Sequence, residues 1–246
     1  MGRGGVPTLR ALPRAFVPGL PDPLTEPFEV PKEEWKKFHN VRRLGSGDPV
    51  AILPNDGRLV RCELQGHEAI PLETLRPETE PLLHLRVALG LPKPDKLEES
   101  VRMGSELGVS EFWLFPAERS VVRWEASKFE AKLKRLESIA REACEVSFRV
   151  RLPVFRVFTN LAKVLDADPE AVVMSESDQG LPALTTDRTE PLTVVIGPEG
   201  GWAPREVAQI GDRAVTLGPR VLRVDTAVVA TCSLLLCGSP SAQVSG

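Results

Sequence analysis

The sequence predicts an α/β protein with a largely parallel sheet, preceded by a small β-rich module. From about residue 82 onward, short apolar runs typical of strands alternate with amphipathic helical patterns. Before that point, Asn55-Asp56-Gly57 separates two strand-like runs, which indicates a β-hairpin. The hydrophobic content of 42% and the charged content of 26% are ordinary for a globular protein.

The composition divides the 246 residues into three parts. We expect residues 1–13 to be a disordered leader, residues 14–75 to form the β-rich module, and residues 82–246 to form the α/β domain. A proline- and acid-rich stretch, residues 71–81, indicates a linker between the two folded parts. Within the module, residues 33–40 are expected to form one short helix.

The α/β domain is expected to consist of strands that alternate with helices. Asp95 and Glu98 form a capping box at the start of the first helix, and Gly108 ends it. The strands are expected at residues 83–89, 111–115, 171–174, 192–196 and 214–217. The helices are expected at residues 95–107, from 127 to about 143, 204–210 and 225–236.

The charges and cysteines exclude several classes of function. The net charge of −3 gives no overall sign of nucleic-acid binding, but Arg119 to Lys163 holds eleven Lys/Arg against five Asp/Glu. Such an excess is typical either of a surface that contacts phosphates or of a solvated helix face. No cysteine belongs to a CxxC pair and only three histidines occur, so we expect no metal site. No apolar run is long enough to span a bilayer, and we expect a cytoplasmic protein.

Two glycine-rich loops near the C-terminus carry the main functional signal. The stretch Val194–Val207 combines a strand, three glycines and the first turn of a helix, and a second loop, Leu217–Arg223, follows another strand. No Lys-Ser/Thr pair follows the glycines, so the first loop is not a P-loop, and Glu199 would repel a polyphosphate. A ligand with a positive centre, such as S-adenosylmethionine, fits better. The alternative is that both loops are only tight connections.

The same loops carry a resemblance to a known family. Residues 196–202 read IGPEGGW and residues 217–223 read LGPRVLR, followed by Asp225-Thr226-Ala227. Together with residues 105–109 and 118–122, they resemble the knotted SPOUT-type RNA methyltransferases, and within them the RsmE clade, which methylates N3 of one uridine in small-subunit (16S) ribosomal RNA. The resemblance implies an N-terminal PUA-like β-barrel and a C-terminal deep trefoil knot that holds S-adenosylmethionine. It also implies a homodimer whose active site draws on both chains.

The resemblance further implies which residues form the site. Arg220 and Arg223 would stabilise negative charge or bind phosphate, and Glu199 would orient or deprotonate the uridine. The alternative is a surface ion pair for each arginine and helix capping for Glu199. The expected cofactor-binding residues are Met174, Ile196, Gly197, Pro198, Glu199, Gly200, Gly201, Leu217, Gly218, Arg220, Val221, Leu222 and Thr226, and the expected RNA-binding residues are Arg14, Arg43, Arg119 and Arg149.

The sequence departs from the family pattern at several places, one of which is the replacement of a His-rich segment by Lys36 and Lys37. Met103 stands where the family has lysine, Val146 stands where it has glutamine, and Val224-Asp225-Thr226 replaces Thr-Glu-Thr. The lost polar groups at Met103 and Val146 indicate either an altered RNA site or a repacked core. Two other functions therefore stay open: a SPOUT methyltransferase that acts on another RNA position, and a catalytically silent RNA-binding or ribosome-assembly protein that kept the fold.

Overall fold

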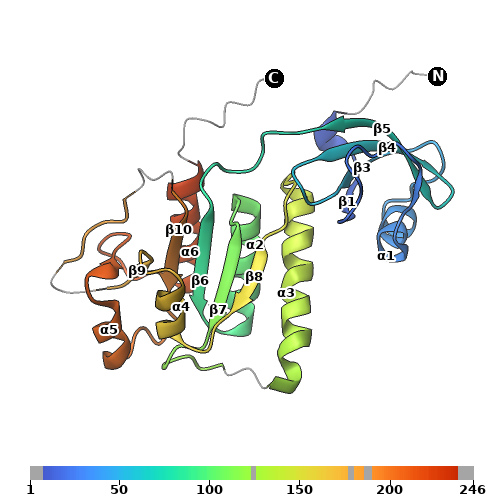
Figure 1. Ribbon diagram of the computed structural model, residues 1–246. Helices are drawn as coiled ribbons and strands as arrows, with labels where there is room; N and C mark the ends of the chain where they lie inside the picture. Colours follow the sequence, from blue (N-terminus) through green and yellow to red (C-terminus); the bar gives the residue numbers. More distant parts are fainter. Residues whose placement is uncertain (1–7, 123–125, 177–179, 186–189, 238–246) are drawn as a thin grey trace. The chain divides into compact units, whose positions relative to one another are not determined.

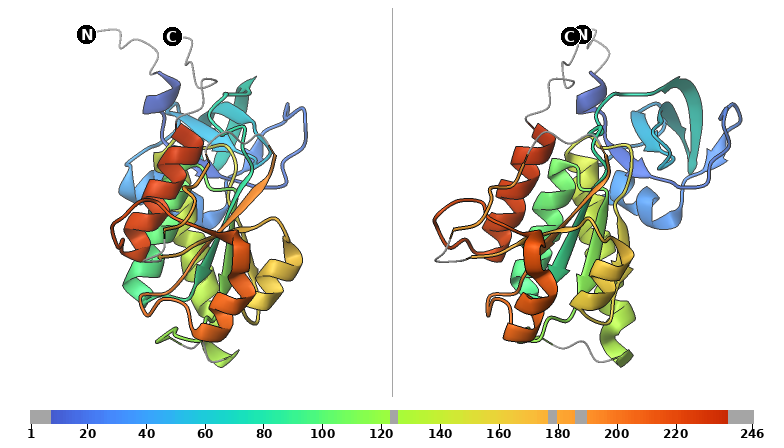
Figure 2. Two further views of the ribbon diagram at one scale, coloured as in Figure 1. Left: turned by 90° about the vertical axis from the view of Figure 1, so that its left-hand side faces the viewer. Right: turned by 60° about the vertical axis from the view of Figure 1, so that its left-hand side comes forward.

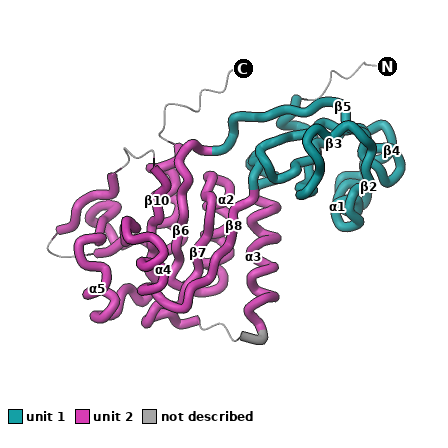
Figure 3. The backbone as a smooth tube through the Cα atoms, in the orientation of Figure 1, with its two compact units in different colours: residues 1–80, 144–151 teal, residues 81–143, 152–246 magenta. Residues whose placement is uncertain are grey.

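The computed structural model describes residues 8–122, 126–176, 180–185 and 190–237. The chain separates into two compact units, which Figure 3 distinguishes by colour. Unit 1 comprises residues 1–80 and 144–151, and unit 2 comprises residues 81–143 and 152–246. A short segment that lies far along the sequence thus belongs to the N-terminal unit. Figure 1 labels most of the helices and strands, which are numbered in chain order.

Unit 1 is built on a five-stranded sheet with the order β1-β3-β4-β5-β2. β1 runs parallel to β3, and the other neighbours are antiparallel. The hairpin predicted at Asn55-Asp56-Gly57 joins β3 to β4, and Asn55 and Gly57 both have positive φ, as such turns require. The strands are β1 (Arg14–Phe16), β2 (Phe28–Glu29), β3 (Pro49–Leu53), β4 (Leu59–Gln65) and β5 (Glu68–Leu75). Where the sequence predicts one helix over residues 33–40, α1 (Lys32–Lys36) is followed by a π-helical turn (Lys37–Val41).

Two other segments of unit 1 differ from the prediction. Leu9–Ala11 is a 3-10 helix, so the part of the expected disordered leader that the structure describes is ordered, and residues 1–7 lie outside the described residues. The Arg14 guanidinium fixes this turn, because it donates hydrogen bonds to the carbonyl oxygens of Leu9 and Arg10. The stretch expected to be a linker begins as a strand, because β5 extends to residue 75.

A buried arginine fastens distant segments of unit 1 together. Arg58 is 1% exposed, and its guanidinium donates to the carbonyl oxygens of Pro21 at 2.7 Å and Leu20 at 3.0 Å. Its Nε also donates to the Asp56 carboxylate at 2.8 Å, and Asp22 adds an ion pair at 3.2 Å. Arg58 therefore holds a loop that precedes β2 against the β3–β4 hairpin.

Unit 2 is built on a six-stranded sheet with the order β11-β9-β10-β6-β7-β8, of which Figure 1 labels all strands except β11. All neighbouring strands are parallel, as the alternation of strands and helices predicts. The apolar run of β10 is buried along its whole length, which is typical of a central parallel strand. The strands are β6 (Leu85–Gly90), β7 (Glu111–Phe115), β8 (Val154–Val157), β9 (Val172–Met174), β10 (Leu192–Ile196) and β11 (Ala214–Val215).

Helices cover both faces of this sheet (Figure 2). Side chains of α2, α3 and α6 pack in one apolar cluster with Val194, and side chains of α4 and α5 pack in another with Val195. Neighbouring residues of β10 thus serve opposite faces, because side chains alternate along a strand. Within the described ranges, no helix has the length and apolar content to cross a membrane. The helices are α2 (Pro94–Leu107), α3 (Ala126–Val146), α4 (Leu161–Ala167), α5 (Pro204–Ile210) and α6 (Val224–Cys232), and α6 continues as a π-helical turn (Ser233–Cys237).

β8 and α4 were not among the elements predicted from the sequence. β8 is an edge strand with mostly exposed residues, so its sequence lacks the apolar alternation that identifies a half-buried strand. α4 has only seven residues, of which Leu161, Val164 and Leu165 are buried. A helix of about two turns offers too few positions for a 3.6-residue period to be recognised.

Gly108 ends α2 in a conformation that glycine adopts without strain. Its φ is +104°, and a Cβ at this position would overlap the ring of Pro81. We expect Gly108→Ala to lower the free energy of unfolding by about 2 kcal/mol, because backbone strain and overlap add. Thermal unfolding measures the loss. The control is Gly201→Ala, where φ is +66° but no atom lies within 4 Å of the Cβ position. An equal loss in both variants would contradict a contribution from Pro81.

Candidate functional site

A cavity of about 440 Å³ opens at the carboxyl edge of the parallel sheet in unit 2. We call it the glycine-loop cavity. It lies where β9 and β10 end, at Met174 and Ile196, and where the chain leaves β11 at Thr216 and Leu217. The carboxyl edge of an open parallel sheet is where ligands bind in many α/β proteins, because the loops that leave the strands meet there.

Most of the residues predicted to bind the cofactor line this cavity. Gly200, Gly218 and Thr226 do not. Gly200 faces Arg119, the Gly218 N–H donates to the Thr216 hydroxyl at 3.1 Å, and Thr226 is exposed in the first turn of α6. The predicted residues that do line the cavity are Met174, Ile196, Gly197, Pro198, Glu199, Gly201, Leu217, Arg220, Val221 and Leu222.

Two glycines of the first loop, residues 197–201, meet different structural requirements, which are close packing at Gly197 and a positive φ at Gly201. At Gly197 a Cβ would lie 3.0 Å from the Trp202 ring, so the indole packs directly against backbone. The Trp202 Nε1 donates to the Met174 carbonyl oxygen at 2.9 Å, which holds the ring between β9 and the loop. At Gly201 a positive φ of +66° turns the chain toward α5. Trp202 was not among the residues predicted for this site, although an aromatic residue close to Gly197 in the sequence is a signal for such packing.

Arg220 and Arg223 lie on the second loop, residues 217–223, and both line the cavity. Both are exposed, and neither forms an ion pair with any residue that the structure describes. This disfavours the alternative in which each arginine belongs to a surface ion pair. Two cations that have no acidic partner among the described residues favour a group that is anionic or that develops negative charge during a reaction, whereas Glu199 at the same cavity favours a positive centre.

Glu199 borders the cavity but has a structural partner. Its Oε1 accepts a hydrogen bond at 3.1 Å from the backbone N–H of Lys93, the residue that precedes the first turn of α2. A carboxylate at this place satisfies a helix N-terminal donor and interacts favourably with the helix dipole. Helix capping, the alternative to catalysis for Glu199, therefore accounts for one of its two oxygens.

Asp225 connects the start of α6 to α2. Its Oδ2 accepts from the Lys96 Nζ at 2.9 Å, and its Oδ1 accepts from the Thr226 N–H at 3.1 Å. The hydrogen bond from Lys96 holds the pKa of Asp225 below its usual value. The carboxylate is therefore ionised and occupied on both oxygens. Asp225, one of the residues that differ from the family pattern, therefore fixes α6 against α2 and does not line the cavity.

Three of the arginines predicted to bind RNA are accessible in part. Arg43 is exposed in unit 1, and Arg14 is half-buried there, with its guanidinium carbon 4.6 Å from the centroid of the Phe148 ring. Arg119 is exposed in unit 2, and its NH1 donates to the Gly200 carbonyl oxygen at 3.2 Å. Arg119 is thus in contact with the first glycine loop.

The fourth arginine, Arg149, has a different environment. It is 4% exposed, and its NH2 and Nε donate to one oxygen of the Glu80 carboxylate at 2.8 and 3.1 Å. The other Glu80 oxygen accepts from the backbone N–H groups of Val150 and Arg151. This buried ion pair holds the segment after α3 within unit 1. The Arg149 guanidinium does not face solvent, so it does not offer the RNA contact that the sequence analysis expects.

Two other departures from the family pattern differ in burial. Val146, at the end of α3, is 77% exposed, so the apolar side chain fills no core. Met103 is half-buried on α2. Core repacking therefore does not explain Val146, and the change affects the surface of the protein.

Residues 78–236 match the family model described as an RNA methyltransferase domain. The curated ribosomal RNA small subunit methyltransferase E of Bacillus subtilis is 34% identical over 219 residues, which cover 81% of this chain and 86% of that protein. The chain belongs to the RNA methyltransferase family. The resemblance to the RsmE clade, predicted from the glycine-loop motifs, is confirmed, and those motifs lie inside the matched residues of this RNA methyltransferase.

Two solved structures share the fold of this RNA methyltransferase. The ribosomal RNA small subunit methyltransferase E of Neisseria gonorrhoeae, solved bound to S-adenosyl methionine, has a TM-score of 0.79 at 24% identity and covers 90% of this chain and 95% of that one. A Legionella pneumophila protein described as a methyltransferase, solved with the cofactor SAM, has a TM-score of 0.82 at 21% identity, with coverage of 91% and 96%. These similarities confirm the predicted α/β fold.

Proposed function

We propose that this RNA methyltransferase transfers a methyl group from S-adenosylmethionine to N3 of one uridine in 16S ribosomal RNA. The glycine-loop cavity carries the proposal, because two loops meet there at the carboxyl edge of the sheet with two arginines that form no ion pair with a described residue. The Bacillus subtilis relative, whose name specifies small-subunit ribosomal RNA, supports the substrate. The Neisseria gonorrhoeae structure, which holds S-adenosyl methionine, supports the cofactor.

The residues of the glycine-loop cavity fit this cofactor. The volume of about 440 Å³ is in the range of pockets that bind small molecules. Met174, Leu217 and Leu222 offer apolar contacts to a purine, and the backbone of residues 197–201 offers hydrogen-bonding groups to its edge. Glu199 suits a ligand that carries ammonium and sulfonium charges. When bound, S-adenosylmethionine supplies an electrophilic methyl group.

The chain's own residues orient the uridine and stabilise its charge in this proposal. N3 of uridine is a weak acid and loses its proton near the time of attack, so that negative charge spreads onto O2 and O4. Arg220 and Arg223 border the cavity and can donate hydrogen bonds to those oxygens. Glu199 orients the site through its contact with Lys93 rather than by removing the proton.

The role of Glu199 is open to a direct test. We expect Glu199→Gln to keep the rate of methyl transfer within about threefold of the wild type, because the amide oxygen still accepts from the Lys93 N–H. Glu199→Ala removes the acceptor and is expected to lower the rate more. The measurement is the initial rate with saturating cofactor and RNA, as a function of pH. A loss of two orders of magnitude in Glu199→Gln, with its pH dependence abolished, would identify Glu199 as the base.

We further infer that the chain at this cavity forms a deep trefoil knot, that unit 1 is a PUA-like RNA-binding module, and that the enzyme is a homodimer. Two loops that leave strands on either side of β9 meet at one cavity, which supports the knot. Arg14 and Arg43 support RNA contact by unit 1. Val207 and Val221 border the cavity and are 54% and 78% exposed, and a second copy of the chain would cover them.

Nucleoside mass spectrometry tests the target. Small-subunit ribosomal RNA from a strain that lacks the gene is expected to lose one 3-methyluridine. The purified protein with S-adenosylmethionine is expected to restore it, on either 30S particles or free 16S RNA. Retention of every methylated uridine in the deletion strain would overturn the proposal.

A second RNA position is the other candidate target. It is favoured by Val146, an exposed apolar residue where the family has glutamine. The same mass spectrometry identifies such a target, because a different modified nucleoside would be lost. Calorimetry with S-adenosylmethionine excludes or supports the catalytically silent alternative, for which no heat of binding is expected.

A further inference from the structure

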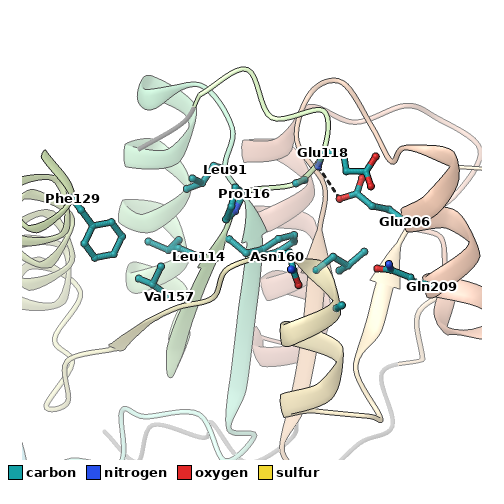
Figure 4. A pocket seen from close by; sticks show the side chains of 13 residues that line it. Leu91, Leu114, Pro116, Glu118, Phe129, Val157, Asn160, Glu206 and Gln209 are labelled. Carbon is teal, nitrogen blue, oxygen red and sulfur yellow. Dashed lines mark hydrogen bonds between the residues drawn. The ribbon is translucent and has the colours of Figure 1, made fainter. Parts of the chain in front are cut away.

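A second cavity, of about 530 Å³, lies at the same carboxyl edge of the unit 2 sheet. We call it the β7 cavity, because the end of β7 and the residues that follow it line the cavity. Apolar side chains such as Leu114 and Val157 line it, and the amides of Asn160 and of Gln209 on α5 border it (Figure 4). Asn160 is the residue before α4, and its side-chain oxygen accepts from the Lys163 N–H at 3.0 Å, which leaves its NH2 group as the donor toward the cavity. The half-buried ring of Phe129 on α3 completes the lining.

Two packed contacts separate the β7 cavity from the glycine-loop cavity. Phe115 lines the first and Trp202 lines the second, and their parallel rings stack with 6.4 Å between centroids. A Cβ at Gly90 would lie 3.0 Å from Pro198 and 3.2 Å from Ala117, so these two side chains pack closely over the glycine. These contacts therefore separate a group bound in the β7 cavity from a methyl group bound in the glycine-loop cavity.

Glu206 stabilises the loop that follows β7, whose residues 116–118 line the β7 cavity. It is 3% exposed, and its two oxygens accept from the backbone N–H groups of Glu118 at 2.9 Å and Ala203 at 3.0 Å. Figure 4 shows the first of these bonds as a dashed line. Because both oxygens are satisfied, the buried carboxylate requires no cation from a ligand. The loop that Glu206 holds also carries Arg119, which is exposed.

The lining of the β7 cavity suits a flat apolar group with a polar edge. Phe129 and Gln209 lie on opposite sides, with Asn160 between them (Figure 4). Aromatic rings stack on unpaired nucleobases, and side-chain amides form hydrogen bonds with base edges. Two exposed cations of unit 2 lie next in sequence to the lining: Arg119 follows Glu118, and Lys128 precedes Phe129. Their positive charge suits the phosphates of an RNA strand.

We propose that the β7 cavity binds an unstacked base of the RNA substrate at a position other than the methylated uridine. The inference rests on the proposed function for its RNA substrate and adds a second point of recognition. A base held in the β7 cavity fixes the register of the RNA strand relative to the glycine-loop cavity. It thereby contributes to the choice of the nucleotide that is methylated.

Filling the cavity tests the proposal. Ala162 on α4 is half-buried and lines the cavity, so the ring in Ala162→Phe takes the space of the base. We expect the KM for the RNA substrate to rise about fivefold, the low end of what stacking one base contributes, with kcat and the Kd for S-adenosylmethionine unchanged. Gln209→Ala, at an exposed position where folding is not at risk, is expected to raise KM by about threefold.

Ala167→Phe is the matched control, because Ala167 is exposed on the same helix and does not line the cavity. Ultraviolet cross-linking followed by peptide mass spectrometry is expected to join an RNA base to residues 114–118 or 157–162 in the wild type, and to lose that product in Ala162→Phe. An unchanged KM for RNA in both Ala162→Phe and Gln209→Ala, or cross-links confined to other segments, would contradict the proposal. If the wild type transfers no methyl group, the proposed function fails, whereas the cross-links still decide what the β7 cavity binds.

Discussion

Arg220→Ala is expected to lower the rate of methyl transfer by about 10²–10³-fold while the Kd for S-adenosylmethionine changes by less than about threefold. Arg220 borders the glycine-loop cavity and has no acidic partner among the described residues. In the proposed reaction its charge is therefore available to the uridine oxygens when N3 loses its proton. In the proposed complex, apolar side chains and loop backbone make most of the cofactor contacts, and the substitution leaves these groups intact.

Single-turnover methyl transfer measures the rate, and calorimetry with S-adenosylmethionine measures the Kd. The control is Arg205→Ala, because Arg205 is exposed on α5 next to the first loop but does not line the cavity. Full activity in Arg220→Ala would remove Arg220 from the mechanism. Loss of cofactor binding in the same variant would instead assign Arg220 to the binding of the cofactor.

The candidate site could be predicted in part because its loops are contiguous in sequence. Gly197 and Gly201 stand out as local signals, and the structure brings them to one cavity with the second loop. Contacts between distant residues gave no such signal. The hydrogen bond from Lys93 to Glu199 and the ion pair between Lys96 and Asp225 join positions more than one hundred residues apart, and only the folded chain brings them together.

The helices and strands could be predicted wherever burial of one face imposes a period on the apolar residues. β7, β10 and α5 have the bounds that the sequence predicts, because each is a run whose apolar residues match a strand or a helix. β8 and α4 could not be recognised, since an exposed edge strand and a short helix impose little pattern. The membership of residues 144–151 in unit 1 also had no local signal, because it depends on the buried pair of Arg149 with Glu80.

Arg58→Met is expected to lower the free energy of unfolding of unit 1 by about 3 kcal/mol. The substitution keeps most of the apolar volume but removes the donors that satisfy the carbonyl oxygens of Pro21 and Leu20. Hydrogen exchange of the β3 and β4 amides reports on this unit locally. The control is Arg61→Met on β4, since Arg61 is 31% exposed and its only ion pair among the described residues is a long one, 3.5 Å to Glu73.

The pH dependence of this loss provides a further check on Arg58. Its side-chain hydrogen bond lowers the pKa of Asp56 in the folded state, so the ionised carboxylate stabilises the fold above the unfolded pKa of about 3.9. That contribution disappears as pH falls through the lowered folded pKa. The difference in unfolding free energy between the wild type and Arg58→Met should therefore be largest near neutral pH and shrink below about pH 4. A difference that stays constant down to pH 2 would show that Asp56 contributes nothing and that the carbonyl contacts alone make Arg58 important.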